Sequence, residues 1–372
     1  MEKSEFRKNA EDMIYLTACA VNNRKPSQER IVDLDLTKLF EVCQEHILTA
    51  CAAYVLESVG IKDNEFTQAK EKAVRKNILL DAERKKILDR LETEKIWYMP
   101  LKGCILKDWY PKLGMRQMSD NDILFDISRR SDVRSIMKEF GFSLKAERVA
   151  VDEYVKAPMF NFEMHGELFM EYQVGAMADY YSSIKERMIK DDDNEYGYHF
   201  SNEEFYLFML AHEYKHFTRG GTGVRSLADT YIFLRKFGDS LDWDYLNAEL
   251  EKMGIADFER SNRELSLKVF SMEELTAEDK KNLDYYVMSG TYGTQENFVV
   301  NAMKSEGGGS RAKYFIYRFF PPVRYLEGSV PWVRKSKLLI PFAYVYRLLR
   351  GITVSRKSFM KEFKYLGRKK KK

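Results

Sequence analysis

The sequence predicts an α+β protein in which a small mixed sheet is embedded in a mostly helical chain. Apolar residues recur at helical spacing up to about residue 95 and again after about residue 191. Between them, short apolar runs alternate with polar side chains, as strands do. This middle stretch is too short to form a large doubly wound sheet, so we expect the flanking helices to cover it.

The composition is that of an ordinary folded chain. Of its 372 residues, 45% are hydrophobic and 32% are charged, which excludes a disordered protein. No apolar run reaches 18 residues, and the charged amino-terminal segment lacks the apolar stretch of a signal peptide. The four cysteines have no CxxC spacing and fit a reducing compartment. We therefore expect a cytoplasmic protein without a transmembrane segment.

Four regions are predicted along the chain. They are an N-terminal helical region (1–94), an α/β core (95–190), a helical region that packs on this core (191–306) and a basic C-terminal helical region (307–372). The net charge of +4 hides an asymmetry, because residues 310–372 carry 18 Lys or Arg and only 2 Glu.

This basic C-terminal region indicates contact with something anionic, such as nucleic acid, anionic lipid or the phosphates of a nucleotide. A solvated tail is the alternative for residues 368–372. The segment 336–352 is compatible with an anionic membrane surface, although Pro341 interrupts any long helix. The aromatic residues that interleave with Arg and Lys in the C-terminal region could bind nucleic acid by stacking and charge, but a helical packing surface with basic positions facing solvent is the favoured interpretation.

The central region is predicted to begin with a strand and a turn. Residues 96–101 form a short apolar strand, Lys102 and Gly103 follow, and a short helix ends before Pro111. Residues 122–127 form a second strand. Two further strands are predicted on either side of a glycine, in the hairpin-like sequence MFNFEMH-G-ELFMEYQV (159–174).

After residue 194 the pattern returns to helix. Ser201 and Glu204 are predicted to form a capping box ahead of a helix that is apolar nearly all round and therefore buried. Gly220 and Gly221 break this helix before a second one.

A pair of aspartates at the start of the second strand is the clearest functional signal. Because side chains alternate along a strand, Asp120 and Asp122 share one face. Two carboxylates so close repel one another, and a divalent cation is the usual compensation. Magnesium prefers hard oxygen ligands and takes one or two carboxylates together with substrate phosphates. The sequence therefore predicts a catalytic metal site at these aspartates, for Mg²⁺ or Mn²⁺.

A third carboxylate would complete this site. Glu171 is the candidate for both catalysis and metal binding, if its strand neighbours the aspartate strand. Glu163, on the preceding strand, is the reserve choice. His46, His165 and His199 are isolated and are interpreted as surface or satisfied core histidines.

The turn before the aspartates is suited to phosphate. Glycine allows the backbone to approach an anion closely, and the start of a helix supplies oriented N–H groups. Lys102, Gly103 and Arg116 are therefore predicted to bind the nucleotide. A lone D-x-D is also common in turns, so the interpretation depends on the combination of these features.

In this order, the residues resemble the signature of the uncharacterised bacterial nucleotidyltransferase family within the polymerase-beta-like superfamily. That family has a lysine–glycine turn, a Tyr-Pro, an arginine and a D-x-D strand, matched here by Lys102, Gly103, Tyr110, Pro111, Arg116, Asp120 and Asp122. Glu171 matches a carboxylate strand often read as E-L-H-W, with Tyr172-Gln173 in place of Leu-His. The later helices match at His212, His216, Arg225 and Asp229. The resemblance begins near residue 35 and spans most of the chain.

The resemblance implies transfer of a nucleoside monophosphate from a nucleoside triphosphate to a hydroxyl acceptor, with release of pyrophosphate. The partners are then a nucleoside triphosphate and an acceptor that is a small molecule, an RNA or a protein. His212, His216, Arg225 and Asp229 would border the acceptor pocket. One departure is Cys104, where the wider superfamily usually has a serine after the glycine, because a thiol is a weaker hydrogen-bond donor than a hydroxyl.

Two other functions stay open at this stage. One is a weakly active or inactive module that binds a nucleotide or RNA on the same scaffold. The other is a zinc peptidase, because residues 212–216 (HEYKH) match H-E-x-x-H. His212 and His216 would share a helix face, and Glu213 would act as the base. A zinc site needs a third protein ligand, and no H-x-x-G-x-x-H continuation follows, which disfavours the peptidase.

Overall fold

The computed structural model describes residues 1–170, 175–305, 308, 310–330, 332–333 and 336–353. It contains a five-stranded sheet in the order β1-β2-β5-β4-β3 and a small two-stranded sheet. The strands are β1 (Tyr98–Leu101), β2 (Asn121–Phe125), β3 (Ser143–Glu147), β4 (Val151–Lys156), β5 (Phe160–His165), β6 (Met188–Lys190) and β7 (Tyr198–Phe200). In the larger sheet β2 and β5 are parallel and the other neighbours are antiparallel. The predicted α+β class with a mixed sheet is confirmed.

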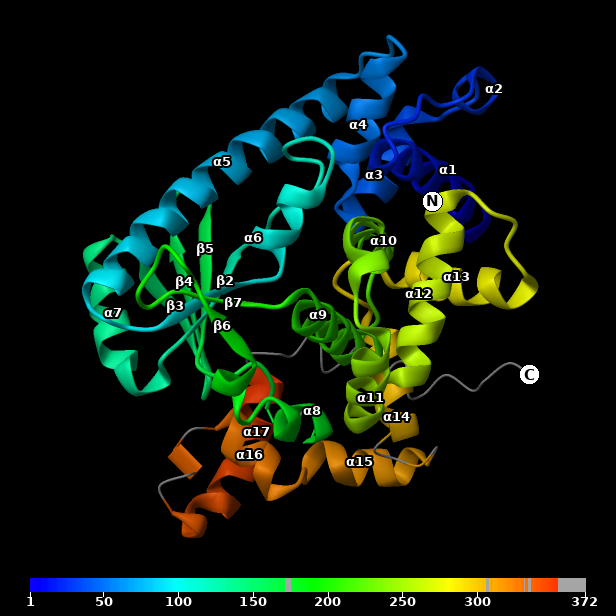
Figure 1. Cartoon of the computed structure of the whole chain (residues 1–372). Coiled ribbons are helices and arrows are strands. Elements are labelled where there is room, and N and C mark those ends of the chain that lie inside the picture. Colours follow the sequence, from blue (N-terminus) through cyan, green and yellow to red (C-terminus); the bar gives the residue numbers. More distant parts are fainter. Residues whose placement is uncertain (171–174, 306–307, 309, 331, 334–335, 354–372) are drawn as a thin grey trace.

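Two helices, α5 (Asn64–Thr93) and α7 (Arg130–Glu139), cover one face of the larger sheet (Figure 1). Leu80, Ile87 and Leu91 of α5 are fully buried there, together with alternate residues of β2 and β5. Most charged residues of α5 are exposed or half-buried, as expected for a helix with one buried stripe. Glu83 is the exception among them, because it is buried and forms ion pairs with Lys86 and Lys156.

The opposite face of the sheet packs on α9 (Asn202–Phe217), through a central core that includes Met99, Leu124 and Phe208. The predicted burial of this helix is confirmed for residues 204–211, whereas its last turn borders the cleft and His216 is exposed. The predicted capping box forms only in part. Ser201 Oγ accepts a hydrogen bond from the Glu204 backbone N–H at 3.1 Å. The Glu204 carboxylate does not return to Ser201, because it accepts hydrogen bonds from Arg187 and Tyr245 instead.

Helices near the start of the chain pack against helices that follow α9 and form a further hydrophobic core with them. Its buried residues include Leu16, Leu39, Leu227 and Phe270. The helices that build it are α1 (Lys3–Val21), α3 (Leu36–His46), α4 (Thr49–Ser58), α10 (Val224–Phe237), α12 (Ala256–Ser271) and α13 (Ala277–Ser289). The N-terminal helices are therefore not a separate unit, since they bury their apolar faces against helices more than 150 residues later.

The remaining helices are shorter or peripheral. They are α2 (Gln28–Ile31), α6 (Gly103–Leu106), α8 (Gly175–Tyr180), α11 (Trp243–Met253), α14 (Gln295–Ser305), α15 (Arg311–Phe319), α16 (Val323–Ser329) and α17 (Ile340–Thr353). The last three lie together at one end of the molecule (Figure 1). Within the described ranges, no helix combines the length and the hydropathy needed to cross a bilayer.

The predicted hairpin around Gly166 is wrong. Its first strand is β5, but residues 167–170 are not a strand, and residues 171–174 lie outside the described part of the chain. Both edges of β5 are already occupied, by β2 on one side and β4 on the other. A strand that folded back at Gly166 would have no free edge to pair with. The antiparallel partner of β5 is therefore β4, which the sequence did not predict.

The packing of α5 on the sheet gives a direct test. Leu80→Ala should lower the free energy of unfolding by about 2–5 kcal/mol, because the side chain is fully buried and its removal leaves a cavity. Ile78→Ala on the same helix is the matched control, with a side chain that is 52% exposed and an expected change within about 0.5 kcal/mol. Urea unfolding measures both. Equal losses from the two variants would contradict this packing.

Candidate functional site

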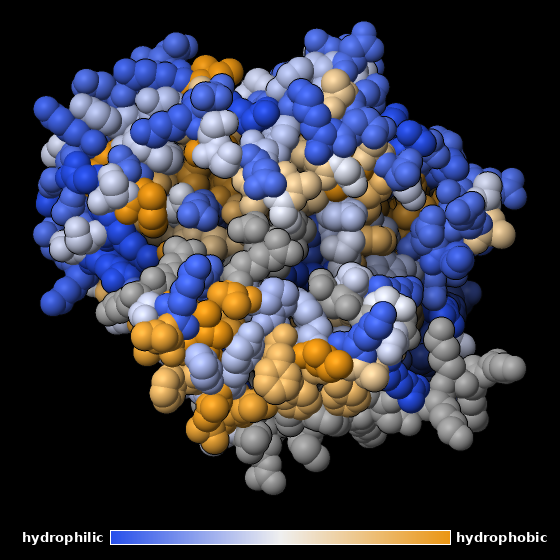
Figure 2. All heavy atoms as spheres, turned by 90° about the horizontal axis from the view of Figure 1, so that it is seen from below, coloured by the Kyte–Doolittle hydropathy of each residue, from blue (hydrophilic) through white to orange (hydrophobic). Residues whose placement is uncertain are grey.

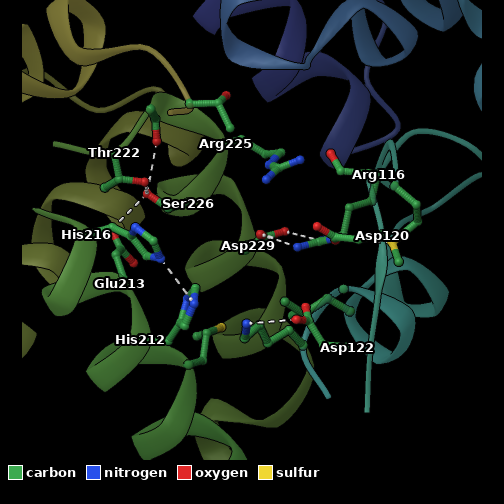
Figure 3. Close-up of a pocket in the computed structure, with 18 of the residues that line it drawn as sticks. Arg116, Asp120, Asp122, His212, Glu213, His216, Thr222, Arg225, Ser226 and Asp229 are labelled. Carbon is green, nitrogen blue, oxygen red and sulfur yellow. Dashed lines mark hydrogen bonds and ion pairs between the residues drawn. The ribbon is translucent and has the colours of Figure 1, made fainter. Parts of the chain in front are cut away.

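A two-lobed cleft lies between the sheet and the α9–α10 pair. The first lobe has a volume of about 340 Å³ and the second about 320 Å³. The side chains that line both lobes are Lys102, Glu163, Phe208, His212 and His216. Figure 3 shows the first lobe, with the two aspartates on one wall facing His212 and His216 on the other. On the sheet side, the two lobes therefore meet at Lys102 and Glu163, both of which were named as candidate site residues from the sequence.

The turn between β1 and α6 brings Lys102 into this cleft. Lys102 has a φ of +50°, which is rare for a residue with a Cβ and costs on the order of 1–3 kcal/mol. Its ammonium group lies 3.3 Å from Asp122 Oδ1. The strained turn thus places a cation beside the buried carboxylate.

Gly103 is required by close packing. A Cβ at this position would lie 2.6 Å from Arg116 Nη1 and 3.0 Å from Met118 Sδ. Any larger residue would push the arginine away from the turn. The following residue, Cys104, is buried and its thiol donates to the Leu101 carbonyl at 3.0 Å. Burial raises the pKa of this thiol to about 11. The departure at Cys104 therefore concerns a side chain that points into the sheet, not into the cleft.

The carboxylates come together through the parallel pairing of β2 and β5. Asp122 is the register partner of Glu163, so the two acidic side chains stand side by side on the cleft face. His165, two residues along β5, lies on the same face, and its Nε2 is 2.8 Å from Asp122 Oδ1 and 3.6 Å from Glu163 Oε2. One ligand atom from each of these three residues lies within 4.8 Å of the others.

The acidic side chains of this site are buried and repel one another, which shifts their pKa values. Burial, and then the charge of Asp122, raise the pKa of Asp120 to about 6. Burial and the same two aspartates raise the pKa of Glu163 to about 7. Burial would also raise the pKa of Asp122, but Lys102 and His165 hold it well below its ordinary value. Lys102 lowers the pKa of all three carboxyl groups, but burial and mutual repulsion outweigh it at Asp120 and Glu163.

This donor set fits a divalent cation. Carboxylate oxygens are the ligands that Mg²⁺ and Mn²⁺ prefer, and a cation would remove the repulsion that raises the two pKa values. Asp122, Glu163 and His165 are the residues whose ligand atoms could hold it together, and Asp120 lines the same lobe two residues before Asp122. Glu171, the first choice from the sequence, lies outside the described residues. Glu163 takes its place in the described site.

His165 was not predicted as a site residue, because its spacing from Glu163 was not considered. Its spacing of two from Glu163 on a predicted strand puts both side chains on one face, and that was the available signal.

A buried ion pair between Arg116 and Asp229 lines the first lobe. The sequence predicted that Arg116 binds the nucleotide and that Asp229 borders the acceptor pocket. Arg116 donates from Nε and Nη2 to the two carboxylate oxygens of Asp229, at 2.8 and 2.9 Å. The Tyr110 hydroxyl also donates to Asp229, at 2.8 Å. These contacts occupy the guanidinium that was predicted to bind phosphate. Arg225 lines the same lobe, and within the described ranges no carboxylate forms an ion pair with it.

Among the described residues, no zinc site forms at the HEYKH helix segment (212–216). The Nε2 atoms of His212 and His216 lie 3.2 Å apart and face the cleft. Glu213 accepts hydrogen bonds from Ser226 and Asn262, both at 2.8 Å. In the part of the chain that the structure describes, the cluster of three possible metal ligands is the one at Asp122, so no third ligand joins the two histidines.

With this geometry in view, the comparisons with known proteins identify the family. The family model described as uncharacterised nucleotidyltransferase matches residues 33–271. The chain belongs to this family. Comparisons with curated proteins and with solved structures gave no match. The segment shared with this family contains the cleft residues from Leu101 to Asp229 and ends with α12. Thr291, Tyr292 and Gly328, which also line the cleft, lie beyond it.

Glu213 is expected to make the stability of the folded chain depend on pH. Burial raises the pKa of Glu213 to about 7, from an ordinary value of 4.5. Between these values the folded protein binds a proton that the unfolded chain has lost. The contribution of Glu213 to stability is therefore present below pH 4.5 and is lost as the pH rises through about 7.

In Glu213→Gln this loss should be absent, because the amide stays neutral and still accepts from Ser226 and Asn262. Urea unfolding from about pH 5 to about pH 8 should show a smaller decline than in the unsubstituted protein. The exposed Glu278→Gln is the matched control and should behave as the unsubstituted protein does. Parallel curves for all three proteins would contradict the assignment.

Proposed function

We propose that this protein transfers a nucleoside monophosphate from a nucleoside triphosphate to an acceptor hydroxyl and releases pyrophosphate. The observation that carries the proposal is the register pairing of Asp122 with Glu163, beside Asp120, at the junction of two lobes of one cleft. Membership of a nucleotidyltransferase family supports the reaction class. A bound Mg²⁺ or Mn²⁺ would supply charge neutralisation for the reacting phosphate.

The nucleotide is assigned to the first lobe. Lys102 and Gly103 border it at the turn, and Arg225 faces it from α10 without an ion-pair partner among the described residues. These groups can contact the triphosphate. Arg116 and Asp229 then act as positioning residues, since their ion pair holds Arg116 Nη1 against Gly103 and so fixes the turn. Phosphate contact, which the sequence predicted for Arg116, is therefore assigned to Arg225.

In the proposed reaction, one bond to phosphorus forms and one breaks. The acceptor oxygen forms a bond to the α-phosphorus, and the bond from that phosphorus to the pyrophosphate oxygen breaks. Glu163 lies where the lobes meet and is assigned as the group that takes the hydroxyl proton. Glu171, predicted from the sequence for catalysis and metal binding, stays a prediction.

The acceptor is assigned to the second lobe, and its lining favours an acceptor with an anionic group. Lys215 and Arg219 both line this lobe, and no described carboxylate forms an ion pair with either. Burial, together with Lys102 and Arg219, lowers the pKa of Lys215 to about 7. A phosphate or carboxylate on the acceptor would relieve this repulsion between cations.

The reaction is tested with each α-³²P-labelled nucleoside triphosphate, Mg²⁺ or Mn²⁺, and a cell extract as the source of acceptor. Asp122→Asn and Glu163→Gln should each reduce label transfer and pyrophosphate release on the order of a hundredfold or more. Glu163→Gln should not lower the unfolding temperature, because burial and neighbouring charges raise the pKa of Glu163 and the amide removes that repulsion. Asp122→Asn should lower it, because the Asp122 carboxylate is paired with Lys102 and His165, so the result for Glu163→Gln separates loss of activity from loss of stability.

The matched control is Asp126→Asn. It lies just beyond β2, and its side chain caps the following turn outside the cleft. Transfer that survives in Asp122→Asn would overturn the proposal. Binding of nucleotide or RNA without turnover would instead support the binding module.

The second lobe is tested by Lys215→Gln and Arg219→Gln. Binding of the nucleoside triphosphate in the first lobe should stay within about twofold, while label transfer to the acceptor should fall at least about tenfold, the loss of one charge-assisted contact. The exposed Lys281→Gln is the matched control. Equal losses of nucleotide binding and transfer would place the triphosphate, rather than the acceptor, in the second lobe.

A further inference from the structure

The outward face of α17 and of the turn before it is apolar. Five large side chains are exposed there: Leu338 (84%), Phe342 (67%), Val345 (55%), Tyr346 (43%) and Leu349 (58%). They recur at spacings of three and four residues, so they form one stripe along the helix. A surface helix of a globular protein normally turns charged or polar residues outward. We call these five residues the α17 stripe.

The α17 stripe is not the side by which α17 packs on the rest of the chain. On its opposite side Ala343 is fully buried, in a small core with Leu326, Val330 and Val333. The Tyr344 hydroxyl donates to the Pro321 carbonyl at 2.9 Å. The helix is therefore already packed by its other side, and the exposed stripe is additional apolar surface.

Neighbouring elements extend the stripe into a patch. Ile316 of α15 and Phe320, the residue that follows this helix, are 64% and 61% exposed, and the ring of Phe320 contacts that of Tyr344. Figure 2 views the molecule from the side of α15–α17 and shows hydrophobic atoms gathered on that end, while blue predominates elsewhere in the view. Contiguous apolar surface of this kind marks an interaction site.

The chain around the patch is basic. Residues 310–372 carry 18 Lys or Arg, and no acidic residue occurs between Glu327 and Glu362. The charged residues of α17 are Arg347 and Arg350. Apolar side chains with basic neighbours and no acids are the pattern of a helix that lies in the interface of a membrane with anionic lipids.

We propose that the α15–α17 face docks on the surface of an anionic lipid bilayer. The α17 stripe enters the boundary between headgroups and acyl chains, and the lysines and arginines contact the lipid phosphates. RNA fits less well, because it stacks on aromatic rings and three of the five stripe residues are aliphatic. A second copy of the chain also fits less well, since it would bring two regions of strong positive charge together.

Docking would place the second lobe of the cleft beside the lipid. Gly328 of α16 lines this lobe. Arg219 lines both it and a cavity of about 650 Å³ to which Tyr314 of α15 and Arg347 of α17 also contribute. An acceptor held at the membrane surface would then reach the carboxylates directly. This consequence rests on the proposed function, whereas the docking itself does not.

The test is flotation of the full chain with vesicles of phosphatidylcholine alone or of equal parts phosphatidylcholine and phosphatidylglycerol. Affinity for the anionic vesicles should be at least about tenfold higher than for the neutral ones, and added salt should reduce it. The double variant Phe342→Ser/Leu349→Ser should lose at least about tenfold in affinity for the anionic vesicles.

Val32→Ser/Ile78→Ser is the matched control, because it removes two exposed apolar side chains far from the patch and should bind as the unsubstituted chain does. Unfolding temperatures should agree among all these proteins. Asp122→Asn should also bind vesicles normally, which separates docking from catalysis. The proposal is overturned if the chain ignores anionic vesicles or if the stripe variant binds them unchanged. It is equally overturned if the stripe variant instead abolishes a dimer or RNA binding.

Discussion

The parallel pairing of β2 with β5 is the constraint on which the rest of the site depends. It sets Asp122 beside Glu163 on the cleft face and Ile123 beside Met164 in the core under α5. A slip of one residue would turn Glu163 into that core and bring an apolar side chain to the cleft. The packing of apolar residues on one face therefore fixes the positions of the carboxylates on the other.

A buried ion pair joins the sheet side of the cleft to the helical side. Arg116 follows the α6 turn and Asp229 belongs to α10, and their two parallel hydrogen bonds are joined by one from Tyr110. Breaking such a pair leaves an uncompensated buried charge, so its geometry is strongly held. Because Arg116 Nη1 also packs on Gly103, the helical side of the protein determines the shape of the strained turn at Lys102.

The HEYKH segment illustrates how a short motif differs from a site. Its two histidines share a helix face, as the motif requires, and that follows from helical periodicity alone. Glu213, one residue after His212, is directed to Ser226 and Asn262 and serves to hold α9 against α10 and α12. A catalytic zinc needs a third ligand from elsewhere in the fold, and the described residues do not supply one.

The sequence by itself determined what depends on local periodicity. The strands at 98–101 and 121–125, the buried helix α9 and the shared face of Asp120 and Asp122 all follow from patterns a few residues long. Only the tertiary structure decided which strands neighbour β2. It thereby brought Glu163 and His165 to the site and paired Arg116 with Asp229. Strand order and long-range pairing depend on which surfaces bury one another, and residues far apart in the sequence carry no local sign of that choice.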